Sequence, residues 1–275
     1  MTIRLVAMDL DDTLLRDNCT ISPRVLEAIQ KAQAQGIVVT IATGRMTIST
    51  RPYAEQLRVD VPIITYHGAM IQQVLSGEIL FRCVIPSALA AEIVDYVAKQ
   101  GIYGQVYLKD RVVASELNEW SREYAKIASV QVEEADLSVL LAQEPEGVEK
   151  ILFIAEEPVL DQLAPMLKQY YGEKIHITKS KPHFLEITDC SVNKGVALDA
   201  LAKHLGIAQE EVMAIGDSFN DLEMIQYAGT GVAMGNARLE IKEQADIVTV
   251  SNEEDGVAEA IERYVLRDEF RRSFE

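Results

Sequence analysis

The chain has 275 residues, of which 48% are hydrophobic and 25% are charged, a composition typical of a globular protein that can bury a sizeable core. Its formal net charge of -17 repels polyanions, so we expect neither nucleic acid nor an anionic membrane surface as a partner. Cys19, Cys83 and Cys190 lack the paired spacing of a zinc or redox site, and no apolar run has the length of a signal or membrane-spanning segment. We therefore expect a cytoplasmic protein with reduced thiols, either a monomer or a weak homo-oligomer.

The first third of the chain alternates between expected strands and helices. Apolar runs at residues 5–8, 37–42 and 62–66 predict buried strands. A helix over residues 22–36 begins with Ser and Pro and ends at Gly, as helices prefer, and a second helix is expected over residues 46–57. This alternation predicts an α/β fold with a parallel, doubly wound sheet.

A hairpin and a second series of alternating elements follow further along the chain. Two short strand patterns around a Ser-Gly turn predict a hairpin over residues 72–81. Near the end of the chain, a helix is expected over residues 193–205 and strands over residues 212–215, 231–234 and 246–249. The first and last thirds therefore form two halves of one sheet in this interpretation.

The segment between these halves mixes helices and strands without regular alternation, so we interpret residues 83–187 as an inserted α+β cap domain. The remaining residues, 1–82 and 188–275, would form the catalytic core. An acidic stretch of the insertion, residues 133–136, is expected to be a solvent-exposed loop. The clearest elements of the insertion are helices over residues 86–99 and 159–170 and strands over residues 103–107 and 150–154. An insertion in a loop of a parallel sheet is well placed to cover the strand ends.

The stretch Asp9-Leu10-Asp11-Asp12-Thr13 follows the first predicted strand directly. Open parallel sheets bind their ligands at this edge. Three carboxylates within four residues repel one another unless a cation lies between them, and a divalent cation with oxygen ligands is the usual solution. The ordinary alternative is a polar loop in which Asp12 or Thr13 caps a helix.

Other polar side chains fall on connections at the same expected edge. Thr43 follows the second strand, Lys194 starts a helix, and Asp217 and Asn220 follow a later strand. Taken singly, each has an ordinary alternative: Thr43 could end a strand, Asn220 could cap a helix and Lys194 could be a surface lysine. Their common location favours a functional site.

This set of residues suits phosphoryl transfer. The carboxylates of Asp9, Asp11 and Asp217 can supply oxygens to Mg²⁺, which binds through few carboxylates together with substrate phosphate. Donors that neutralise the phosphate oxygens would stabilise the transition state and supply the local positive charge that an acidic protein needs. These donors are Thr43, Lys194, Asn220 and the backbone amides near Leu10 and Gly44.

The chain resembles haloacid dehalogenase (HAD) superfamily phosphatases of the type IIB, Cof-like branch. The resemblance extends over nearly the whole chain, with an insertion of the right size between the second and third motifs. The four family motifs correspond to Asp9-Leu10-Asp11-Asp12-Thr13, Thr43-Gly44-Arg45, Lys194-Gly195, and Gly216-Asp217-Ser218-Phe219-Asn220-Asp221.

The resemblance implies a role for each matched residue. Asp9 would be the nucleophile that forms an aspartyl-phosphate, and Asp11 would act as general acid and then as general base. Mg²⁺ would be held by Asp9, the backbone carbonyl of Asp11, and Asp217. Phosphate would be bound by Thr43, Gly44, Lys194 and Asn220.

Three further residues of the motifs are assigned supporting or structural roles. Asp221 would orient Lys194 or the metal-bound waters, Arg45 would support the site, and Asp12 is interpreted as structural. The ordinary alternatives for Asp221 and Arg45 are a first-turn acid of a helix and an exposed charge.

Further candidate positions lie outside the motifs. His67 stands where many members of the family have Asn before Gly-Ala, and a lone His is more often a packed residue than a catalyst, so we leave it out of the predicted site. Residues near the end of the insertion are candidates for contact with the leaving group, with a charged surface strand as the alternative: Lys179, Lys181, His183 and Glu186.

These observations predict a Mg²⁺-dependent phosphatase that acts on small phosphorylated metabolites, with sugar phosphates as the foremost class. One alternative is a phosphomutase of the same fold, which returns the phosphoryl group to a sugar instead of water. A second is a phospho-receiver signalling domain, which stores an aspartyl-phosphate. A second acid two residues after Asp9 argues against storage, because a neighbouring base would speed hydrolysis.

Overall fold

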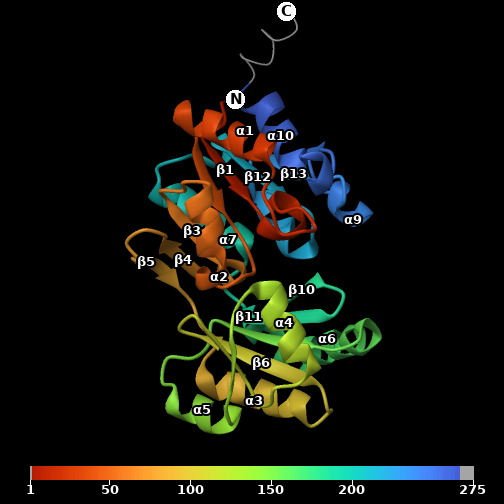
Figure 1. The fold of residues 1–275 in the computed structure, drawn as a ribbon. Coiled ribbons are helices and arrows are strands. Elements are labelled where there is room, and N and C mark those ends of the chain that lie inside the picture. Colours follow the sequence, from red (N-terminus) through yellow and green to blue (C-terminus); the bar gives the residue numbers. More distant parts are fainter. Residues whose placement is uncertain (1, 267–275) are drawn as a thin grey trace, which may run out of the picture.

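A five-stranded parallel sheet lies at the centre of the part built from the two ends of the chain (Figure 1). The computed structural model describes residues 2–266. The strand order is β14-β13-β12-β1-β2, with every neighbouring pair parallel, so the predicted doubly wound sheet is confirmed. The strands are β1 (Leu5–Met8), β2 (Val38–Ile41), β12 (Val212–Gly216), β13 (Thr230–Ala233) and β14 (Ile247–Val248).

Helices cover both faces of this sheet, which explains why its strands are almost wholly apolar. In β1, Val6 and Met8 pack into the hydrophobic cluster beside α1 and α10, whereas Leu5 and Ala7 pack into the cluster beside α7 and α8. The helices of this part are α1 (Pro23–Ala34), α2 (Thr47–Gln56), α7 (Lys194–His204), α8 (Leu222–Tyr227), α9 (Leu239–Lys242) and α10 (Gly256–Tyr264).

The third predicted strand joins the main sheet only weakly. β3 (Pro62–Thr65) meets β2 through a single parallel bridge between Ala42 and Ile64 and otherwise pairs with β4. Pro62 has no backbone N–H to donate, and its carbonyl accepts the Thr40 hydroxyl at 2.8 Å. The predicted hairpin is confirmed, with β4 (Met70–Gln73) and β5 (Ile79–Arg82) antiparallel.

The inserted segment builds a second sheet of six strands in the order β10-β11-β9-β6-β7-β8 (Figure 1). One face packs against α3, α5 and α6, and the other packs against α4 and turns toward the first part. Its elements are α3 (Ser87–Ala98), β6 (Tyr103–Leu108), β7 (Arg111–Ala114), α4 (Glu119–Ala128), β8 (Val132–Glu134), α5 (Leu137–Gln143), β9 (Lys150–Ile154), α6 (Glu157–Tyr171), β10 (Ile175–Lys181) and β11 (Phe184–Asp189). We keep the proposed names core and cap for the two parts.

The prediction of an acidic loop in the cap is wrong in part. Glu133 and Glu134 lie in β8, where Glu133 pairs with Arg111 of the adjacent strand, so the ion pair offsets the poor strand propensity of the acids. Asp136 caps α5 by accepting the backbone N–H groups of Ser138 and Val139. None of the helices within residues 2–266 is both long and apolar enough to span a membrane.

Candidate active site

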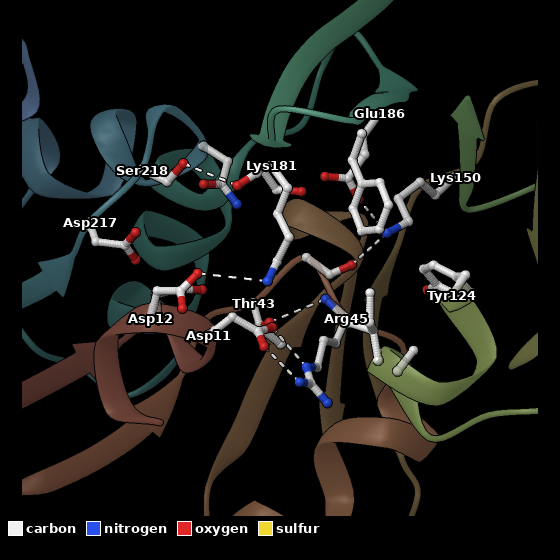
Figure 2. Close-up of a pocket in the computed structure, with 17 residues that line it drawn as sticks. Asp11, Asp12, Thr43, Arg45, Tyr124, Lys150, Lys181, Glu186, Asp217 and Ser218 are labelled. Atoms are coloured by element: carbon white, nitrogen blue, oxygen red, sulfur yellow. Dashed lines mark hydrogen bonds and ion pairs between the residues drawn. The ribbon is translucent and has the colours of Figure 1, made fainter. Parts of the chain in front are cut away.

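A pocket of about 60 Å³ lies between the carboxyl ends of the core strands and the cap (Figure 2). Parallel strands end at a common edge, so residues that are far apart in the sequence meet there. The core lines the pocket with Asp9, Asp11, Asp12, Thr43, Gly44, Arg45, Asp217, Ser218 and Asn220. The cap adds Tyr124, Ile127, Ala128, Lys150, Ser180, Lys181, Phe184 and Glu186.

Asp9 is held where β1 ends. Its backbone N–H donates to the Ile215 carbonyl at 2.9 Å, which continues the pairing with β12 by one residue. The chain then enters a short helical turn, η1 (Leu10–Leu14), in which Leu10 is fully buried and anchors the turn in the core. The Asp9 side chain is 8% exposed and carries a carboxylate into the pocket.

Lys194 is the first residue of α7 and is fully buried. Its ammonium group lies 2.5 Å from Asp9 Oδ1 and 2.5 Å from Asp221 Oδ1. Burial alone would lower the pKa of Lys194, but the carboxylates of Asp221 and Asp9 outweigh burial and raise the pKa above its ordinary value. Lys194 therefore remains a cation inside the site.

Asp221 holds other site residues in place. Its Oδ1 receives the lysine, and its Oδ2 accepts the backbone N–H groups of Asp217 and Ser218, each at 3.0 Å. Both oxygens are thus occupied by protein donors. This geometry agrees with the expected orienting role, since Asp221 fixes both Lys194 and the loop that carries Asp217.

The remaining acids carry more negative charge than Lys194 can balance. Burial, and then repulsion from Asp221, raise the pKa of Asp9 well above its ordinary value. The same two causes raise the pKa of Asp217 to about 8. Asp217 keeps one oxygen engaged by the Thr13 hydroxyl at 2.8 Å.

This donor set fits a divalent cation. Carboxylate oxygens of Asp9, Asp217 and Asp221 lie within 4.8 Å of one another. Because the Asp221 oxygens are already taken, Asp9 and Asp217 are the acids with an oxygen free for a metal. Hard oxygen ligands and excess negative charge are what Mg²⁺ requires. The Asp11 carboxylate does not belong to this group of oxygens.

Asp11 instead forms a two-point ion pair with Arg45. Arg45 Nε and Nη2 donate to Asp11 Oδ2 and Oδ1 at 2.7 and 2.6 Å (Figure 2). The guanidinium also lies 5.6 Å from the centre of the Tyr53 ring. Burial would raise the pKa of Asp11, but Arg45 outweighs it and holds the pKa below its ordinary value. Asp11 is therefore an ionised partner of Arg45 in this arrangement.

Thr43, Gly44 and Asn220 also line the pocket. The Thr43 hydroxyl accepts the backbone N–H of Arg45 at 3.1 Å, which fixes the turn after β2. A Cβ atom on Gly44 would lie 2.1 Å from His67 Cε1, so only glycine fits beneath the imidazole ring. Asn220, in the short turn η5 (Phe219–Asp221), is 7% exposed and lines the pocket with its amide group.

The four leaving-group candidates divide into two pairs. Lys181 and Glu186 line the pocket, and Lys181 Nζ lies 3.7 Å from Asp12 Oδ2 (Figure 2). Lys179 pairs with Glu157 and Asp161 and lines an adjoining groove instead of the pocket, while His183 Nδ1 lies 3.2 Å from the Ala155 carbonyl oxygen. Glu186 is 3% exposed, so the alternative of a charged surface strand is wrong for this residue.

Sequence reasoning assigned no role in the site to several residues found there, among them Tyr124, Lys150 and His67. Tyr124 and Lys150 line the pocket, and His67 packs on Gly44 and Asn220. A lysine that begins an otherwise apolar strand was a usable signal for Lys150, because buried lysines need a partner. His67 gave no comparable signal, since its neighbours come from distant parts of the chain.

Comparisons with known proteins agree with this geometry. A family model for haloacid dehalogenase-like hydrolases matches residues 6–261. The chain is 32% identical over 264 residues to a 5-amino-6-(5-phospho-D-ribitylamino)uracil phosphatase of Bacillus subtilis (strain 168), covering 94% of this chain and 97% of the relative.

Solved structures give the same result at the level of the fold. A haloacid dehalogenase-like hydrolase from Bacteroides thetaiotaomicron has a TM-score of 0.85 at 33% identity, covering 95% of this chain and 99% of that one. A HAD subclass IIB sugar phosphatase has a TM-score of 0.83 at 24% identity, covering 95% and 98%, and shares the fold. The chain belongs to the haloacid dehalogenase-like hydrolase family.

Proposed function

We propose that this protein is a Mg²⁺-dependent phosphatase that hydrolyses small phosphorylated metabolites, sugar and polyol phosphates foremost, through an aspartyl-phosphate intermediate. The observation that carries the proposal is the position of the buried Asp9 carboxylate. It contacts Lys194 through one oxygen, stands beside Asp217, and faces the pocket. A carboxylate placed in this way can attack phosphorus while its neighbours bind the phosphoryl oxygens.

The first step would transfer the phosphoryl group to Asp9. An Asp9 oxygen attacks phosphorus, the bond to the leaving-group oxygen breaks, and a mixed anhydride forms on the side chain. Water then attacks the phosphorus of this anhydride, which releases phosphate and restores the carboxylate. The phosphoryl oxygens would be held by Lys194, Asn220, the Thr43 hydroxyl, and the backbone N–H groups of Leu10 and Gly44.

Asp9, Asp217 and the backbone carbonyl of Asp11 would hold the metal ion. When bound, Mg²⁺ supplies positive charge that neutralises the phosphoryl oxygens and the excess acid of the site. Lys194 neutralises part of the same charge, and Asp221 keeps its ammonium group directed at Asp9.

Asp11 would protonate the leaving group and then activate water. In the arrangement described above its carboxylate is ionised and bound to Arg45. We therefore propose that Asp11 exchanges the guanidinium for the leaving-group oxygen when substrate binds, and that Arg45 holds it ready between turnovers. This exchange would raise the pKa of Asp11 toward the value that a general acid needs.

The shape of the site supports a small, polar substrate. The inner pocket shares residues, including Lys181 and Ser218, with a wider groove of about 510 Å³. The phosphoryl group would occupy the pocket and the leaving group the groove. Side chains of both charges line the groove, among them Asp161 and Arg238, which suits a hydroxyl-rich molecule. The relative described above acts on a phosphorylated ribityl compound.

A panel of phosphorylated metabolites together with p-nitrophenyl phosphate tests the proposal, with phosphate release followed in Mg²⁺ and in EDTA. We expect steady turnover in Mg²⁺, loss of turnover in EDTA, and the highest kcat/KM on a sugar or polyol phosphate. Conversion of one sugar phosphate into an isomer without phosphate release would indicate the phosphomutase instead. A single stoichiometric phosphorylation without turnover would indicate the receiver domain.

A further inference from the structure

A second group of buried charged residues lies where the cap meets the core, outside the four motifs. Lys150 of β9 and Glu186 of β11 come from the cap, and His67 comes from η2 (Tyr66–Gly68) of the core. Their exposures are 2%, 3% and 1%. Lys150 Nζ donates to Glu186 Oε1 and to the Gly44 carbonyl oxygen, both at 2.7 Å (Figure 2). The ammonium group of Lys150, a cap residue, thus holds the backbone of Gly44, a predicted phosphate-binding residue.

His67 connects the cap carboxylate to a second predicted phosphate-binding residue. Its Nε2 lies 2.8 Å from Glu186 Oε1, and its Nδ1 lies 3.3 Å from Asn220 Nδ2. Because the amide nitrogen of Asn220 is a donor, Nδ1 must accept, which leaves the ring proton on Nε2 beside the carboxylate. Burial lowers the pKa of His67 and favours this neutral form.

The backbone that carries His67 is held in a costly conformation. Tyr66 and His67 have φ angles of 50° and 56°, in the left-handed region that few residues other than glycine adopt. Such residues persist when surrounding contacts compensate for the strain. Both side chains reach the cap, since the Tyr66 hydroxyl donates to Asp110 Oδ1 at 2.6 Å while His67 meets Glu186. The backbone N–H groups of Tyr66 and His67 donate to the carbonyls of Arg45 and Thr43 at 2.9 and 3.1 Å, so the core itself holds the turn from which both side chains reach the cap.

We propose that His67 is a positioning residue that couples docking of the cap to the phosphate-binding groups of the core. This inference rests on the proposed function, because it assumes that Gly44 and Asn220 bind phosphate. With the cap docked, Glu186 and His67 fix the Asn220 amide, and Lys150 fixes the Gly44 peptide. When the cap moves away both contacts are lost, so phosphate affinity falls and product can leave.

The chain offers a matched control for the docking contact itself. Asp110 of the cap also accepts the backbone N–H of Ile48 at 3.2 Å, and its partners, Tyr66 and Ile48, belong to the core but do not line the pocket. Asp110→Ala removes a cap–core contact without touching Gly44 or Asn220. His67→Asn removes the imidazole bridge while keeping a residue type that tolerates the left-handed region.

The test is the affinity of the full-length protein for inorganic phosphate in Mg²⁺, measured by titration calorimetry. We expect His67→Asn to weaken phosphate binding roughly 3- to 10-fold, the effect of one lost hydrogen bond. Asp110→Ala should change it by less than about twofold, although both variants lose a cap–core contact. Thermal unfolding of both variants establishes that they are folded at the temperature of the titration.

Other outcomes contradict the coupling. Unchanged phosphate affinity in His67→Asn, or an equal loss in both variants, would mean that His67 serves only to dock the cap or has no role. If His67→Asn does not fold, Lys150→Met combined with Glu186→Gln removes the cap half of the network without leaving a lone buried charge. We expect this double variant to lose phosphate affinity by the same factor, roughly 3- to 10-fold, because it also removes hydrogen bonds. Unchanged affinity would overturn the coupling.

Calorimetry also separates this inference from the proposed function. A wild-type protein that binds no phosphate would contradict the proposed function. A wild-type protein that binds phosphate as tightly as His67→Asn would contradict the coupling alone. Binding that weakens as expected, in a protein without phosphatase activity, would support the coupling and reject the phosphatase.

Discussion

Two buried lysines flank the same pocket, and their surroundings differ in charge balance. Lys194 is surrounded by several acids of the core, whereas Lys150 meets one carboxylate, Glu186, beside a neutral imidazole. Around Lys194 the excess acid raises the pKa values of Asp9 and Asp217. Burial of Glu186 would raise its pKa, but His67 and Lys150 outweigh burial and lower it below its ordinary value.

This difference separates a cluster with excess acid from a cluster whose single carboxylate is already paired with an ammonium group. The excess acid around Lys194 suits a bound cation, whereas Glu186 and Lys150 balance each other. Neutralising an acid should therefore have opposite effects on stability in the two clusters, because it relieves repulsion in one and leaves an unpaired charge in the other.

The largest effect is expected from Asp9→Asn. Turnover should fall to background, because the nucleophile is lost, while the unfolding temperature without Mg²⁺ should be unchanged or higher, because one acid of a like-charge cluster is neutralised. Phosphate release and thermal unfolding in EDTA measure the two effects. Substantial residual turnover in a purified sample would remove Asp9 from the nucleophile's role.

Asp11→Asn should reduce activity by an amount that depends on the leaving group. A sugar alkoxide needs a proton as it departs, so phosphorylation of Asp9 by a sugar phosphate should slow by roughly 10²- to 10⁴-fold, the usual contribution of a positioned acid. With p-nitrophenyl phosphate the same step should be nearly unchanged, because p-nitrophenolate leaves without a proton. Single-turnover rates on both substrates measure the difference, and equal losses would count against the acid role.

Glu186→Gln probes the cluster around Lys150. Removing its charge leaves the Lys150 ammonium group buried without a counter-charge, which costs about 3–5 kcal/mol of unfolding free energy. Lys150→Met combined with Glu186→Gln should recover much of this loss, since no charge then remains buried. Urea denaturation of the wild type and the two variants tests the prediction, which fails if Glu186→Gln is as stable as the wild type.

The smallest effect, taken per pH unit, is the change in stability of the metal-free protein with pH. Burial and Asp221 raise the pKa of Asp217 from 3.8 to about 8, so between these values the folded state holds a proton that the unfolded state has lost. Stability should therefore fall as pH rises across this range, by at most about 1.4 kcal/mol per pH unit for one group. Unfolding in EDTA from pH 5 to 8 measures the slope, and Asp217→Asn should flatten it. An equal slope in this variant would assign the effect to other groups.

The sequence predicted the cluster around Lys194 because its members follow from a topological rule. Asp9 and Asp217 come directly after apolar strands and Thr43 comes two residues after one, and parallel strands bring such positions to one edge. Strand and helix periodicity, together with the four motifs, was enough to identify the parallel sheet and the residues at its edge.

The cluster around Lys150 could not be predicted in the same way. Its members lie within cap strands and in a core turn, and their meeting depends on how two separately packed sheets face each other. No local pattern encodes that orientation. The pairing of Asp11 with Arg45 was missed for a related reason, because a motif assigns a residue to a site without fixing where its side chain points.

Rapid mixing of Asp11→Asn with p-nitrophenyl phosphate tests most directly the central claim, a covalent intermediate on Asp9. Formation of the intermediate should remain fast in this variant, while its hydrolysis slows for lack of the base. We predict a burst of p-nitrophenolate close to the enzyme concentration, a slow steady rate after it, and a phosphoryl group on Asp9 in the quenched protein. A linear time course without a burst and without phosphorylated Asp9 would contradict the account.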